Sequence, residues 1–124
     1  MLNSATPTVL LVDDVPETLE TLSAVLSADG FQVKTAGSAQ EALELISREQ
    51  PGALVSDLDM PGMNGYELAR QVRSLYPDEV LLIALSGTLP SGKNALTNCF
   101  GFDHLLGKPV PVSVLEGLLR LENA

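Results

Sequence analysis

The stretch VSDLDMPGMNG, residues 55–65, joins an apolar run to a pair of carboxylates and then to two glycine-containing pairs. The run at residues 53–55 indicates a buried strand, and Ser56, Asp57 and Asp59 come after it. Burying a charged carboxylate without a partner is costly. A buried strand that ends in acidic side chains therefore indicates a site in which other groups complete the charge.

Apolar runs and amphipathic segments alternate along the whole chain. The run 80–87 is apolar almost throughout, as expected of a central parallel strand buried on both faces. Pro16 and Gly30 bound one expected helix, and Ser38 with Glu41 has the spacing of a capping box. We expect strands at 8–14, 31–36, 53–57, 80–87 and 103–109, and helices at 16–30, 38–51, 65–75, 92–100 and 112–122, the fourth helix being short or frayed. This alternation predicts a (βα)5 α/β fold, with a parallel sheet covered by helices on both faces.

The composition is that of one globular domain. The 124 residues are 45% hydrophobic and include no tryptophan, so the core should be aliphatic. The net charge of −9 argues against nucleic acid as a direct ligand, because phosphate backbones are bound by clustered lysine and arginine. A single cysteine, with no signal sequence and no apolar run of membrane length, favours a cytoplasmic protein that binds no membrane. We expect residues 1–6 to be a flexible tail and residues 7–124 to form the domain.

Functional side chains lie at the ends of four expected strands. Asp13 and Asp14 end the first, Asp57 the third and Ser86 the fourth, while Lys108 lies beside the end of the fifth. The carboxyl ends of parallel strands share one edge of a sheet, where ligands bind. Three carboxylates there repel one another unless a divalent cation is bound, and Mg²⁺ suits an all-oxygen site that keeps several waters. Such a site suits phosphoryl transfer, with Asp57 as the nucleophile that forms an acyl phosphate.

Four motifs, in this order, resemble the receiver domains of two-component response regulators. They are LVDD at 11–14, SDLDMPGMNG at 56–65, ALSG at 84–87 and GKPV at 107–110, and the resemblance covers about residues 8–120. It implies the flavodoxin-like strand order 2-1-3-4-5. It also implies a single receiver domain without an output domain, of the kind that stands alone or accompanies a hybrid sensor kinase.

The resemblance assigns a role to each acidic residue. Asp57 would accept a phosphoryl group from a phosphohistidine of a histidine kinase or histidine phosphotransfer protein. Asp14 and Asp57 would ligate Mg²⁺ directly, with Mn²⁺ as an alternative ion, and Asp13 would act through water. The backbone carbonyl of Asp59 would be the third protein ligand.

The other motif residues would respond to the phosphoryl group. Ser86 and Lys108 would contact its oxygens, and the peptide bond before Pro109 is expected to be cis. Many receivers carry an aromatic switch residue three positions before the lysine, where this chain has Leu105, so the usual aromatic readout is in question. A downstream protein partner would bind the face made by the fourth helix, fifth strand and fifth helix.

Two other functions compete with this hypothesis. The residues DLD at 57–59 also resemble the nucleophile and acid of haloacid-dehalogenase phosphohydrolases, but that class requires threonine or valine where this chain has Pro61, and a nucleophile on the first strand. A pseudo-receiver, which keeps the fold as an interaction module, is disfavoured by the presence of all five key side chains. Leu105 and the weak fourth helix are its only support.

A working receiver is not a conventional enzyme, since it catalyses its own phosphorylation and dephosphorylation.

Each residue also has a purely structural interpretation. Asp13 and Asp14 alone fit a helix N-cap, and Asp57 alone fits a turn. Cys99 fits a small packing group, and His104 fits a surface residue because it has no histidine or cysteine companion for zinc. The functional interpretation is favoured because the key side chains coincide at the ends of strands.

Overall fold

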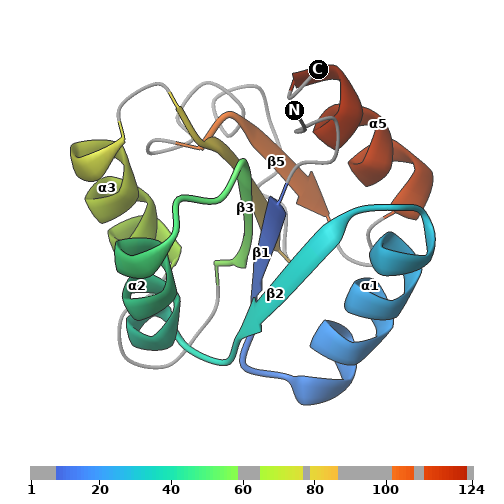
Figure 1. The fold of residues 1–124 in the computed structure, drawn as a ribbon, viewed down its shortest axis with the longest axis horizontal. Coiled ribbons are helices and arrows are strands. Elements are labelled where there is room, and N and C mark those ends of the chain that lie inside the picture. Colours follow the sequence, from blue (N-terminus) through green and yellow to red (C-terminus); the bar gives the residue numbers. More distant parts are fainter. Residues whose placement is uncertain (1–7, 59–64, 77–78, 87–101, 108–110, 123–124) are drawn as a thin grey trace.

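The computed structural model describes residues 8–58, 65–76, 79–86, 102–107 and 111–122. Strands and helices alternate along them (Figure 1) in the order that the sequence predicts. The strands are β1 (Thr8–Val12), β2 (Gln32–Ala36), β3 (Ala53–Asp57), β4 (Leu81–Ser86) and β5 (His104–Gly107), and the helices are α1 (Pro16–Ala28), α2 (Ala39–Arg48), α3 (Gly65–Leu75) and α5 (Val112–Glu122). The helix expected at 92–100, which includes Cys99, and the expected tail lie outside the described residues.

All five strands pair in parallel, in the order β2-β1-β3-β4-β5. The predicted α/β fold and its strand order 2-1-3-4-5 are confirmed. In Figure 1, α1 and α5 cover one face of the sheet, and α2 and α3 cover the other. Because β1 lies between β2 and β3, the order in which the chain adds strands reverses there, and ligands of such sheets bind beside this point.

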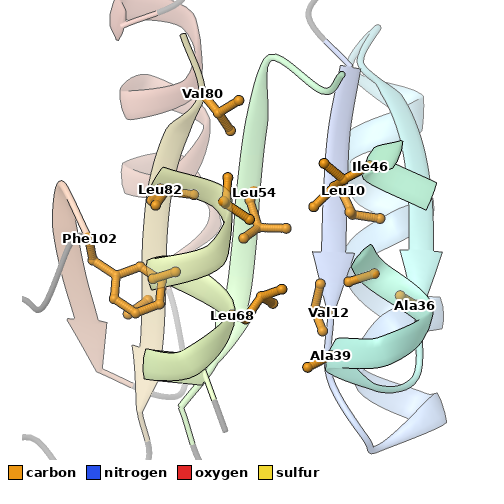
Figure 2. Close-up of a cluster of buried hydrophobic side chains, with 14 of the residues drawn as sticks. Leu10, Val12, Ala36, Ala39, Ile46, Leu54, Leu68, Val80, Leu82 and Phe102 are labelled. Atoms are coloured by element: carbon orange, nitrogen blue, oxygen red, sulfur yellow. The ribbon is translucent and has the colours of Figure 1, made fainter. Parts of the chain in front are cut away.

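The sheet separates two aliphatic cores. Successive residues of a strand point to opposite faces, so Leu10 packs with residues of α2 and α3, whereas Leu11 packs with residues of α1 and α5. Figure 2 shows the first of these cores, in which Phe102 is the only aromatic side chain labelled. Every residue of β3 and of β4 is buried, as expected of central parallel strands. Among the described residues the cores are aliphatic, as predicted, except for Phe31 in one core and Phe102 in the other.

The local sequence explains where the helices begin and end. α1 starts at Pro16, whose missing N–H costs nothing in a first turn, and the chain leaves the helix through Gly30, whose φ of +99° disfavours other residues. α2 follows Ser38, whose hydroxyl accepts the Glu41 N–H at 3.1 Å. The Glu41 carboxylate accepts the N–H of Gly37 at 2.8 Å, one residue earlier than the capping box predicts.

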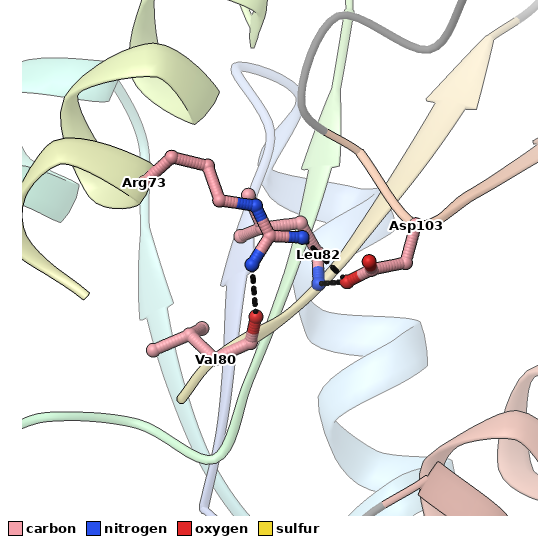
Figure 3. Close-up of polar contacts among 4 residues, drawn as sticks. All are labelled: Arg73, Val80, Leu82 and Asp103. Carbon is pink, nitrogen blue, oxygen red and sulfur yellow. Dashed lines mark hydrogen bonds and ion pairs between the residues drawn. The ribbon is translucent and has the colours of Figure 1, made fainter. Parts of the chain in front are cut away.

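Arg73 of α3 bonds to residues next to the starts of β4 and β5 (Figure 3). Its guanidinium donates to the Val80 carbonyl at 3.0 Å and pairs with the Asp103 carboxylate at 2.7 Å. The same carboxylate oxygen accepts the Leu82 N–H at 2.9 Å, and the Asp103 N–H donates to the Leu82 carbonyl at 2.7 Å. Asp103 therefore continues the pairing of β4 with β5 before β5 begins, at the edge of the sheet opposite the strands' carboxyl ends.

Where the boundaries can be compared, the strands differ from the predictions by one or two residues. β4 begins at Leu81 and β5 at His104, each one residue later than predicted, and β1 ends at Val12, two residues earlier than predicted. The predicted ends of β4 and β5, at 87 and 109, lie outside the described residues. His104, predicted to be a surface residue, begins β5 and is half-buried. Among the described residues, no helix is both long enough and apolar enough to span a bilayer.

Candidate functional site

Three neighbouring strands bring polar side chains to one edge of the sheet. β1 ends at Val12 and is followed by Asp13 and Asp14, β3 ends in Asp57, and β4 ends in Ser86. β3 pairs with β1 on one side and with β4 on the other, so Asp57 lies on the central strand of the three. These side chains therefore lie at the carboxyl ends of the parallel strands, which is the edge of the sheet that the sequence predicts for them.

The three aspartates form a compact acidic cluster. Asp13, Asp14 and Asp57 each offer one carboxylate oxygen, and these oxygens all lie within 4.8 Å of one another. Asp13 and Asp57 are only 3% and 4% exposed, whereas Asp14 is open to solvent. Like charges this close and this poorly hydrated destabilise one another. A divalent cation would relieve that repulsion, and oxygen donors are the ligands that a hard cation such as Mg²⁺ prefers.

The backbone holds Asp13 in place within this cluster. Its Oδ1 accepts the N–H of Val15 at 2.9 Å, and its own N–H donates to the Ala36 carbonyl at 3.2 Å. The N-cap of α1 is Val15, and no side chain caps it among the described residues, so the predicted structural alternative in which Asp13 or Asp14 is the N-cap is wrong. One carboxylate oxygen of Asp13 therefore already accepts a backbone hydrogen bond, that from the Val15 N–H.

Residues 9–120 match the protein family described as the response regulator receiver domain. The chain belongs to this family. It is 42% identical over 103 residues to an uncharacterized 14.6 kDa protein of Leptolyngbya boryana, covering 82% of this chain and 79% of that protein. It is 35% identical over 113 residues to the response regulator MprA of Mycobacterium leprae, covering 91% of this chain and 48% of MprA, so it spans about half of that relative.

The solved structure of a response regulator protein shares the fold. The response regulator protein TrrA of Thermotoga maritima, in complex with Mg²⁺-BeF, superposes with a TM-score of 0.81, covering 94% of this chain and 99% of that one at 24% identity. At this identity the likeness shows the fold alone. In a receiver fold, the nucleophile predicted at Asp57 ends the third strand, and the haloacid-dehalogenase hypothesis, which needs it on the first, has no support.

Of the other predicted site residues, the structure describes Ser86 and Leu105. Ser86 is 4% exposed and lies opposite Gly107 in the pairing of β4 with β5. Leu105 lies opposite Ala84 and packs, partly buried, against the core beneath α2 and α3. The other predicted site residues, Asp59, Lys108 and Pro109, lie outside the described residues.

Ser56, to which the sequence-based prediction assigns no role, directly precedes Asp57. It is fully buried, and its hydroxyl donates to the backbone carbonyl of Asp57 at 3.1 Å. The signal was available in the sequence, since Ser56 is a polar residue inside an apolar strand and directly precedes the candidate nucleophile.

Proposed function

We propose that this receiver domain accepts a phosphoryl group on Asp57 in a Mg²⁺-dependent reaction and acts as a switch or relay in two-component signalling. The observation that carries the proposal is the acidic cluster, in which Asp13, Asp14 and Asp57 bring carboxylate oxygens within 4.8 Å of one another on the edge used by ligands. Two of the three carboxylates are almost fully buried, and a bound cation would offset the repulsion among them.

The donor set fits a cation with few protein ligands. In the proposed site, Asp14 and Asp57 would ligate Mg²⁺ directly, the backbone carbonyl of Asp59 would be a third ligand, and Mn²⁺ would be an alternative ion. Asp13 acts through water, which agrees with the bond that one of its oxygens already makes to the Val15 N–H. When bound, Mg²⁺ would neutralise charge on the phosphoryl oxygens during transfer.

In the proposed reaction, a carboxylate oxygen of Asp57 attacks the phosphorus of a phosphohistidine on a histidine kinase or histidine phosphotransfer protein. The new O–P bond forms as the P–N bond breaks, and the electron pair of the broken bond stays on the donor imidazole. Ser86 and Lys108 donate hydrogen bonds to the phosphoryl oxygens. In hydrolysis, water attacks phosphorus and the O–P bond breaks, which restores the Asp57 carboxylate and releases inorganic phosphate; in relay, a second histidine replaces the water.

The proposal also covers the location of the protein, the extent of its domain and its downstream partner. We infer a cytoplasmic protein whose residues 7–124 form one receiver domain, with a downstream partner bound at the face that includes β5 and α5. Leu105 packs against the core as an aliphatic side chain, so any switching there would be a change in packing without an aromatic ring.

The decisive test is the intact mass of the protein after incubation with acetyl phosphate and Mg²⁺. We expect one phosphoryl adduct, mapped to the peptide that contains Asp57, and none after addition of EDTA or in Asp57→Asn protein. If no adduct forms, the binding of beryllofluoride with Mg²⁺, the combination named for TrrA, is measured next. Failure of both would favour the pseudo-receiver hypothesis.

A further inference from the structure

The peptide unit between Asp57 and Leu58 is held at both ends. Its N–H, that of Leu58, donates to the Leu85 carbonyl of β4 at 3.0 Å. Its carbonyl, that of Asp57, accepts the Ser56 hydroxyl at 3.1 Å. These two bonds fix the orientation of the peptide plane between Asp57 and Leu58, directly after the candidate nucleophile.

Burial makes the hydroxyl bond hard to replace. Ser56 is fully buried, Asp57 is 4% exposed and Leu58 is 7% exposed, so bulk water cannot readily take the place of a missing donor. The neighbours of Ser56 across the sheet are Val12 on β1 and Ala84 on β4, and neither has a side-chain hydrogen-bond donor. A buried hydroxyl among such neighbours is costly unless it is hydrogen-bonded, and the Ser56 hydroxyl is bonded to the Asp57 carbonyl.

We propose that Ser56 is a positioning residue for phosphoryl transfer: its hydroxyl holds the peptide after Asp57 so that the carboxylate faces the cation and the phosphoryl donor. The inference rests on the proposed function of Asp57. The Ser56 side chain is buried and bonds to the backbone beside the nucleophile, and it is proposed to act through that bond. Its effect is on geometry, because a misplacement of about 1 Å can lower a reaction rate by roughly 10²-fold.

The test compares rate constants for phosphorylation by acetyl phosphate at saturating Mg²⁺, together with the Kd for Mg²⁺ and the melting temperature. We expect Ser56→Ala to lower the rate constant about 5-fold, the factor that corresponds to one ordinary hydrogen bond. Ser56→Thr, which keeps the hydroxyl, should restore most of the rate. The matched control is Val55→Ala, a buried truncation on the opposite face of the same strand, which should lower the melting temperature more than Ser56→Ala while leaving the rate of the folded protein unchanged.

Two results would overturn the inference: Ser56→Ala protein that is labelled at the wild-type rate, or Val55→Ala protein that is slowed as much as Ser56→Ala. If Ser56→Ala does not fold, Ser56→Thr and Ser56→Val decide the question, since they have nearly the same shape and only one has a hydroxyl. A faster Thr variant supports the inference and equal rates refute it. Wild-type protein that forms no adduct would instead count against the proposed function.

Discussion

Arg73 and Asp103 form an ion pair at 2.7 Å that joins α3 to the start of β5, across 30 positions of the chain. The pair is one part of a larger arrangement, since the Asp103 carboxylate also accepts the Leu82 N–H and the guanidinium also donates to the Val80 carbonyl. Half-exposed ion pairs contribute little when isolated, but a carboxylate that also satisfies a backbone N–H contributes more.

Asp103→Ala should therefore destabilise the fold by about 2 kcal/mol, because Leu82 loses its acceptor and Arg73 loses its counter-charge. The measurement is the free energy of unfolding in urea. The control is Arg70→Ala, which removes an exposed pair with Glu67 at 3.5 Å within α3 and should cost less than about 0.5 kcal/mol. Equal costs for the two variants would show that the Asp103 bonds contribute no more than a surface ion pair.

Asp14→Asn should change stability in opposite directions with and without Mg²⁺. Without the ion, the substitution relieves repulsion in the acidic cluster and should raise the free energy of unfolding by roughly 0.5–1 kcal/mol. With Mg²⁺, wild-type protein gains stability in proportion to its occupancy, and the variant should gain far less. Melting temperatures over a Mg²⁺ titration provide the measurement. A variant that gains as much as wild type would remove Asp14 from the ligand set.

Glu116 of α5 provides a pH-dependent prediction. Its Oε2 is buried without a hydrogen-bond partner among the described residues. The Asp29 carboxylate, which can accept a hydrogen bond from the protonated form of Glu116, raises the pKa of the Glu116 carboxyl above 4.5. Burial and the Asp29 charge raise this pKa further, and Arg120 opposes them. The folded state thus holds this proton more tightly than the unfolded state. The stabilising contribution is fully present below the unfolded pKa of 4.5 and is lost as pH rises through the raised pKa.

Glu116→Gln, which keeps a donor toward Asp29 at every pH, should therefore melt like wild type at about pH 4 and at a higher temperature near neutral pH. Melting temperatures of both proteins across this range are the measurement. Glu44→Gln, on the exposed face of α2, reports the general effect of removing one negative charge from a chain of net charge −9. The explanation fails if the difference between Glu116→Gln and wild type does not grow with pH.

Lys108→Ala should separate metal binding from the response to phosphorylation. We expect the Kd for Mg²⁺ to stay within about 2-fold of wild type, because the ammonium group is proposed to contact the phosphoryl oxygens and not the ion. The change in amide hydrogen exchange that beryllofluoride induces in wild-type protein should be weakened. A large loss of Mg²⁺ affinity would show that the role of this lysine is misassigned.

The parts of the fold that repeat a local pattern could be predicted from the sequence. The apolar run of β4, the proline at the start of α1, the acids after β1 and the acid at the end of β3 each reflect a rule that acts over a few residues. Parallel topology then brings Asp13, Asp14 and Asp57 to one edge, which is why the candidate cluster could be predicted although its members lie on different strands.

The contacts that were missed depend on geometry that no periodic pattern encodes. The bond from Arg73 to Asp103 joins two surface-prone residue types that are distant in the chain, and either one alone indicates only a solvated charge. The bond from Ser56 to the next carbonyl depends on one rotamer at the end of a strand. The Glu41 carboxylate accepts the N–H of Gly37 and not that of Ser38, a difference of one residue that the spacing of Ser38 and Glu41 does not specify.

The burial of β3 has a consequence for how a signal could leave this molecule. The strand is hydrogen-bonded to β1 and β4, and all five of its residues are buried. Segments of this kind exchange their amide protons through global unfolding and not through local opening. The residue proposed to carry the phosphoryl group would therefore stay a fixed point in the molecule, and the movement that a partner detects would arise in the elements around it.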